Sequence, residues 1–209
     1  SMESSVFTTG SNDTTRNLTA ATGWSLANNS YTSARVAAPF AILDTIYESM
    51  QFILEADPDL VFPPVDVFWS ANNSLKNSSL DLYDPDEVDA IDSGELGGSF
   101  YLFGTNVMLI TGDAVGEPGV YPSDTDEFDA HIVAHEWGHY LDDNIFRSDS
   151  PGGTHRIGER ADSRLAWGEG WATALASMIL DDPAYCESGT PGTNAGFEIN
   201  AEGGFFGGQ

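Results

Sequence analysis

Apolar residues recur at helical spacing between residues 33 and 56. The stretch reads SARVAAPFAILDTIYESMQFILEA, and its large apolar side chains fall mostly three or four residues apart, at Ile42, Ile46, Met50, Ile53 and Leu54. This spacing places them on one face of a helix. Pro39 lies near the start, where a helix tolerates proline. The pattern therefore predicts an amphipathic helix.

A two-residue alternation replaces the helical spacing further along the chain. Residues 65–71, VDVFWSA, alternate as expected for a half-buried strand. Residues 99–104, SFYLFG, and 106–112, NVMLITG, meet at Gly104-Thr105 and predict a β-hairpin. Helical periodicity then returns, and we expect one helix over about residues 124–144 and another over about residues 166–181.

The start of the first of these helices carries polar and acidic residues. Ser123 and Asp126 have the S-x-x-D spacing of a capping box. Further acidic side chains nearby suit the positive end of a helix dipole. We therefore expect Ser123 and Asp126 to cap the helix.

Length and charge narrow the classes of function. A chain of 209 residues with 41% apolar residues is about one globular domain. The formal net charge is −26 and Lys76 is the only lysine, which argues against nucleic acid or an anionic membrane surface as a partner. No apolar run approaches the length of a transmembrane helix. The single Cys186 excludes an intrachain disulfide within this sequence.

The two ends of the sequence bear on localisation. No signal peptide is present, and the opening Ser1-Met2 suggests that a natural signal has been removed. The Gly-rich end, residues 196–209, has no tidy terminal element, so we expect the natural chain to continue beyond it. The strong negative charge suits a secreted, extracellular or cell-surface protein.

Three of the four histidines lie in the segment HIVAHEWGHY, at His131, His135 and His139. Residues four apart share a helix face and lie about 6 Å apart along its axis, so one ion can reach an adjacent pair but not both ends of the row. The inner pair forms the H-E-x-x-H motif with Glu136, which is placed to take a proton from a water molecule at the metal. We interpret His131 as a residue on the same helix face that supports the site without binding the metal. Trp137 faces away from the pair and is expected in the core.

A catalytic zinc site needs a third protein ligand. A histidine in H-E-x-x-H-x-x-G-x-x-H is excluded, because the chain has Asp142 and Ile145 at those positions. An aspartate in a G-T-x-D segment is also excluded, because Gly153-Thr154 is followed by histidine and arginine. A glutamate on the next helix fits, at Glu169 in WGEGWA.

The helix of Glu169 carries small residues on the glutamate's face, namely Ala172, Thr173 and Ala176. Small residues let two helices approach closely, and Gly138 in the first helix fits the same close approach. The opposite face, with Trp171, Leu175, Met178 and Ile179, is expected to fill the core. The alternative for Glu169 is an acidic residue placed near a helix start by the dipole.

The segments HEWGH and GEGWA together resemble the gluzincin branch of the zincin metallopeptidases, especially secreted bacterial metallopeptidases with an E-G-W/F-A segment. The resemblance is sharp over about residues 131–180. It implies one Zn²⁺ per chain, with His135, His139 and Glu169 as metal ligands and Glu136 as the catalytic base. The implied function is zinc-dependent hydrolysis of peptide bonds in a peptide or protein substrate.

The same resemblance implies an α+β fold. A twisted, mostly antiparallel sheet would pack on the HExxH helix and the following Glu-bearing helix, in a single zincin-like domain over residues 1–209. An edge strand within 106–111 would hold an extended peptide by strand addition.

The sequence departs from thermolysin-like enzymes beside the third ligand. Those enzymes have Asn before the glutamate and Asp four residues after it, whereas this chain has Gly168 and Thr173, so the groups that support the ligands must differ. Such enzymes also supply a tyrosine or histidine to stabilise the oxyanion. Tyr185, His155 or a residue beyond 209 could fill that role.

Other interpretations of the sequence remain open. A zinc-stabilised surface-binding or adhesion module without catalysis is the main alternative function, although such a module has no need of Glu136. A calcium ion has weak support, because the acidic loop 84–95 lacks the ligand order of an EF-hand. Four arginines between the ligand segments either pair with nearby acids or offer one guanidinium to a substrate carboxylate: Arg147, Arg156, Arg160 and Arg164.

Overall fold

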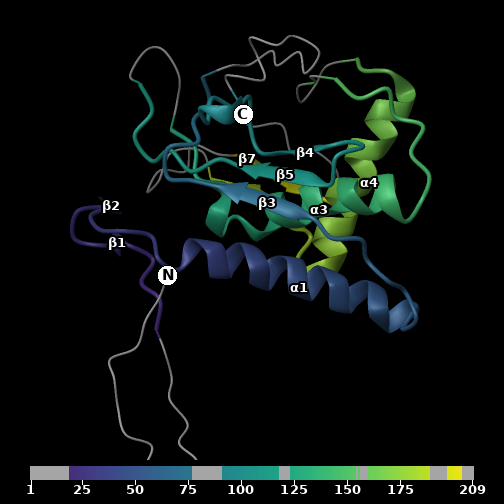
Figure 1. The fold of residues 1–209 in the computed structure, drawn as a ribbon, viewed down its shortest axis with the longest axis horizontal. Coiled ribbons are helices and arrows are strands. Elements are labelled where there is room, and N and C mark those ends of the chain that lie inside the picture. The colour runs from purple at the N-terminus through teal and green to yellow at the C-terminus, as the bar shows by residue number, and fades with distance from the viewer. Residues whose placement is uncertain are drawn as a thin grey trace, which may run out of the picture.

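A computed structural model describes residues 19–76, 91–117, 123–153, 155, 160–188 and 197–203. Three helices of fifteen residues or more carry these parts of the chain, together with short strands (Figure 1). In chain order the elements are β1 (Trp24–Ser25), β2 (Ser30–Tyr31), α1 (Ala38–Ala56), β3 (Asp66–Trp69), β4 (Phe100–Leu102), β5 (Val107–Ile110), the 3₁₀ turn η1 (Asp126–Phe128), α3 (Ala130–Asn144), α4 (Ser163–Ile179), β6 (Ala184–Glu187) and β7 (Phe197–Asn200). The predicted helices and the predicted hairpin are confirmed, with boundaries shifted by a few residues.

The largest sheet within the described residues has the order β3-β5-β4. β5 is parallel to β3 and antiparallel to β4, so the sheet is mixed rather than mostly antiparallel. The expectation of an edge strand within 106–111 is wrong, because β5 is paired on both sides. Val107–Ile110 is an unbroken apolar run, and such a run suits a strand buried in the middle of a sheet. The edge strand is β4 instead.

The main hydrophobic core lies where α1, α3 and α4 meet the sheet. α3 contacts both other helices and strands β4 and β5 (Figure 1). Trp137 and Tyr140 are each only 1% exposed, and Trp137 is a core residue as predicted. α1 begins at Ala38, and Pro39 lies in its first turn. Backbone N–H groups in the first turn have no partner within the helix, so the missing N–H of proline costs no hydrogen bond there.

The start of α3 differs from the expected capping box. The α-helix begins at Ala130 after η1, and its N-cap is Asp129, whose side chain makes no capping hydrogen bond. Asp126 instead receives hydrogen bonds from the side chains of Ser99 and Thr111, more than a dozen residues earlier in the chain. Contacts with the residue before β4 and the residue after β5 therefore replace the local cap.

α4 packs against α3 through the small face that the sequence indicates. Ala172 and Ala176 are fully buried, and Leu175 is in the core. Met178 is 54% exposed, so the prediction that it fills the core is wrong. The helix is capped by Asp162, whose carboxylate accepts a hydrogen bond from the backbone N–H of Arg164.

Candidate metal centre

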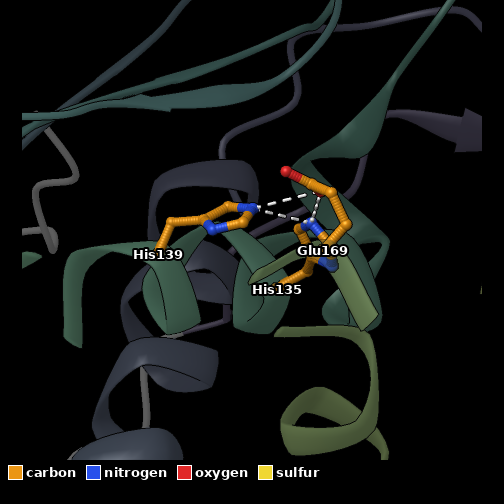
Figure 2. A group of neighbouring side chains, drawn as sticks. All are labelled: His135, His139 and Glu169. Atoms are coloured by element: carbon orange, nitrogen blue, oxygen red, sulfur yellow. Dashed lines mark hydrogen bonds and ion pairs between the residues drawn. The ribbon is translucent and has the colours of Figure 1, made fainter. Parts of the chain in front are cut away.

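Two histidines of α3 and one glutamate of α4 converge on one point (Figure 2). The Nε2 atoms of His135 and His139 are 3.0 Å apart. The Oε2 atom of Glu169 lies 3.2 Å from the first and 3.3 Å from the second. The structure thus brings together the three residues that the sequence nominates as metal ligands.

The close approach of α4 to α3 brings Glu169 within reach. A Cβ atom added at Gly138 would lie 3.3 Å from both the Cα and the Cβ of Ala172. Ala172 is three residues after Glu169 and lies on the same helix face. Any larger side chain at this crossing would push α4 away, and the carboxylate would move with it.

The spacing of the three ligand atoms fits a tetrahedral zinc site. With bonds of about 2.0–2.1 Å, two ligand atoms on such an ion are about 3.3 Å apart. The separations of 3.0, 3.2 and 3.3 Å are close to this value. Because an imidazole carries at most one proton on each nitrogen, the two facing Nε2 atoms cannot both donate to each other. Two histidines and a carboxylate are a donor set that zinc binds.

Charge within the cluster already favours an ionised carboxylate. Burial alone raises the pKa of Glu169, but hydrogen bonds with His135, His139 and His155 outweigh it and hold that pKa well below its usual range. Burial lowers the pKa of His139, yet its hydrogen bond to Glu169 and the nearby Glu136 charge raise it overall. The site therefore attracts positive charge, whether a proton or a metal ion.

Thr173 supports His135 from α4. Its Oγ1 lies 3.2 Å from His135 Nδ1. If Nδ1–H donates to this hydroxyl, Nε2 is left with a free lone pair for a metal. Thr173 stands four residues after Glu169, at one of the two positions where the sequence departs from the thermolysin pattern. The sequence identified it only as a small residue, because hydrogen bonding between helices is invisible to spacing.

Glu136 lies beside the ligands without joining them. Its side chain is buried, and its Oε2 accepts a hydrogen bond of 2.8 Å from the backbone N–H of Tyr101 in β4. Tyr101 is paired with Met108 of β5, and its N–H donates to Glu136. Burial raises the pKa of Glu136, although the charges of His135 and His139 oppose this. The edge strand thus fixes the carboxylate next to the ligand cluster.

His131 is not part of the cluster, as expected. Its Nε2 lies 3.2 Å from the backbone carbonyl oxygen of Asp182, so the imidazole can donate to the segment after α4. Its ring is 5.3 Å from the ring of Tyr185 in β6. His131 therefore helps to hold β6 against α3.

Both residues suggested as oxyanion stabilisers lie near the ligands. His155 Nε2 is 3.1 Å from Glu169 Oε2, and this hydrogen bond raises the pKa of His155 to about 9. The ring of Tyr185 is 5.9 Å from the ring of His135, and burial raises its pKa far above the usual value. His155 is the more exposed of the two and Tyr185 is buried.

Two of the four arginines, Arg147 and Arg164, follow the local interpretation. Arg147 pairs with Asp149 at 3.1 Å and Arg164 pairs with Asp162 at 3.0 Å, both on the surface. Arg156 lies outside the described residues. A different arginine, Arg35, forms a buried ion pair that sequence reasoning missed.

Comparison with known families gives one match. The family model for the mycolysin C-terminal domain matches residues 110–202, a segment that contains both helices of the cluster. The match supports a relationship with secreted bacterial zinc metallopeptidases. Comparisons with curated proteins and with solved structures gave no match. No helix within the described residues is long and apolar enough to cross a membrane.

Proposed function

We propose that this chain is a secreted bacterial zinc metallopeptidase of the gluzincin type, with a zincin-like fold. The observation that carries the proposal is the convergence of His135, His139 and Glu169, with Glu136 next to them but not among them. The family match over both helices supports a relationship with metallopeptidases.

Each residue of the centre has a separate task. His135, His139 and Glu169 would hold the metal, and Thr173 would orient His135. A bound zinc ion would lower the pKa of water to about 7 and polarise a substrate carbonyl. Glu136 would take the proton from the attacking water and pass it to the leaving amine. β4, the edge strand beside Glu136, would align an extended peptide.

The second candidate is a zinc-stabilised binding module that catalyses nothing. The ligand cluster alone is compatible with it. What favours hydrolysis is Glu136, because a purely structural zinc site gains nothing from a buried carboxylate held by Tyr101 at hydrogen-bond distance.

A metal measurement tests the ligand set. The wild-type chain, purified without chelator, should contain about one zinc per chain. Glu169→Gln keeps the side chain's size but removes its charge, and should weaken zinc binding by at least about 10–100-fold. Glu48→Gln on the exposed face of α1 makes the same chemical change away from the site and should leave zinc content unaltered. Full zinc retention in Glu169→Gln would remove that residue from the ligand set.

A cleavage assay then separates the two functions. Zinc-loaded wild type should cleave unfolded casein, and Glu136→Gln should keep the zinc but lose at least about 100-fold in rate, the scale of general base catalysis. Tyr185→Phe and His155→Gln, assayed beside it, identify the oxyanion stabiliser as the one that lowers kcat and leaves zinc content unchanged. Zinc binding with no cleavage, both by wild type and by a chain extended beyond residue 209, would favour the binding module.

A further inference from the structure

A second group of acidic side chains lies apart from the zinc ligands. Asp124, Asp126 and Glu187 each offer an oxygen, and these oxygens lie within 4.8 Å of one another. The two aspartates precede α3, and Glu187 ends β6. The cluster thus joins segments that are about 60 residues apart in sequence.

Hydrogen bonding leaves this cluster incomplete. Ser99 Oγ donates to Asp126 Oδ2 at 2.6 Å, and Thr111 Oγ1 lies 3.0 Å from Asp124 Oδ2, so one oxygen of each aspartate has a hydroxyl partner. The other oxygen of each aspartate, Oδ1, is buried and has no hydrogen-bond partner among the described residues. The aspartates are only 4% and 2% exposed. Two buried, unpartnered carboxylate oxygens are costly unless a proton or a cation meets them.

The described basic side chains do not supply that cation. Four of the five described lysine and arginine residues instead form ion pairs outside the cluster: Arg35 with Glu127, Lys76 with Glu95, Arg147 with Asp149 and Arg164 with Asp162. The neighbouring Asp129 adds further negative charge, since its carboxylate repels both aspartates and Glu187. Burial raises the pKa of Asp124 to about 6 and that of Glu187 to about 7, so three ionised groups are unfavourable here without added positive charge.

We propose that Asp124, Asp126 and Glu187 bind one calcium ion. Calcium takes carboxylate and other oxygen ligands at about 2.3–2.6 Å, so oxygens on opposite sides of the ion are about 4.6–5.2 Å apart. The limit of 4.8 Å within the cluster is compatible with one ion that touches all three side chains. An all-oxygen set favours a hard cation over zinc, and an irregular set of protein oxygens suits calcium better than magnesium.

Strand β6 connects the proposed calcium site with the proposed zinc centre. Tyr185 and Glu187 are two residues apart on this strand, so their side chains lie on the same face. Tyr185 packs beside His131 and His135, while Glu187 reaches the aspartates before α3. A calcium ion would therefore fasten β6 to the start of α3 and hold Tyr185 against the zinc ligands.

Calcium titration of zinc-loaded protein tests the proposal without relying on activity. Calorimetry in about 0.15 M salt, which screens diffuse binding to an acidic surface, should show one calcium ion per chain. At a hundredfold excess over Kd, Tm should rise by roughly 5–10 °C for a domain of this size. Magnesium at equal concentration should shift Tm much less.

Matched variants assign the ion to these residues. Asp126→Asn and Glu187→Gln should each abolish the calcium-dependent rise in Tm. Glu187 is only partly buried, so Glu187→Gln keeps the test valid if Asp126→Asn does not fold. Asp44→Asn and Glu48→Gln, on the exposed face of α1, should respond like wild type. Glu169→Gln should still bind calcium even though its zinc affinity falls, which separates this proposal from the zinc centre.

Several outcomes would overturn the calcium site. One is a wild-type Tm that millimolar calcium leaves unchanged. Another is a calcium response in Glu187→Gln equal to that of wild type. An equal response to magnesium would contradict the choice of calcium.

Discussion

Gly138→Ala probes the contact that lets Glu169 reach the histidines. Glycine inside a helix is normally less stable than alanine by about 0.8–1.0 kcal/mol, so the substitution should stabilise an isolated helix. Here the new Cβ would lie 3.3 Å from two atoms of Ala172, compared with an optimum of about 3.5–4.0 Å for carbon atoms. Neither atom belongs to a flexible side chain, so relief requires a movement of α4 itself.

The expected size follows from these two opposing effects. Overpacking of a well-packed interior costs about 1–3 kcal/mol, which outweighs or cancels the helix gain and leaves Gly138→Ala about 0–2 kcal/mol less stable than wild type. Gly170→Ala on α4 is the matched control, because nothing lies within 4 Å of a Cβ added there. That variant should gain about 1 kcal/mol. The two variants should therefore differ by about 1–3 kcal/mol, or roughly 2–12 °C in Tm.

Urea denaturation of the metal-free protein measures this difference, and zinc titration measures its effect on the site. Because α4 must shift to admit the methyl group, Gly138→Ala should also bind zinc about tenfold more weakly. Loss of a residue that orients a metal ligand typically weakens metal binding by a similar factor. Gly170→Ala should bind zinc like wild type. If Gly138→Ala were as stabilising as Gly170→Ala, with unchanged zinc affinity, the close helix crossing would not constrain the site.

Two further predictions concern charges away from the candidate zinc ligands. Arg35 forms a buried ion pair with Glu127 and also donates to the carbonyl of Gly112. Arg35→Met should therefore lower the free energy of unfolding, measured by urea denaturation, by about 3–5 kcal/mol. Arg147→Met, which removes an exposed ion pair, should have little effect. Hydrogen bonds from Arg164 lower the pKa of Asp162 to about 2 from an ordinary 3.8, so the stabilisation is present above about pH 4 and is lost as pH falls towards 2. Asp162→Asn keeps a capping oxygen but has no charge, so its Tm should be below that of wild type at neutral pH and equal to it by about pH 2. A lower Tm that persists at that pH would contradict this assignment.

Local spacing in the sequence was sufficient to nominate the candidate zinc ligands that the structure brings together. His135 and His139 share a helix face because they are four residues apart, and that geometry does not depend on the rest of the fold. Glu169 could be nominated because a run of small residues on its own helix marks a close crossing. The hairpin of β4 and β5 and the first long helix were predictable for the same reason, since their periodicity and turn signals lie within a few residues.

Features that depend on distant partners were decided only by the tertiary structure. Asp126 has the spacing of a helix cap, but Ser99 and Thr111 bind its carboxylate, and Glu187 completes the acidic cluster from β6. The placement of β5 at the centre of the sheet follows from pairing with β3, about 40 residues earlier in sequence. Hydrogen bonds and ion pairs between such segments leave no periodic trace in the sequence, because each partner is fixed by the packing of whole elements rather than by its neighbours along the chain.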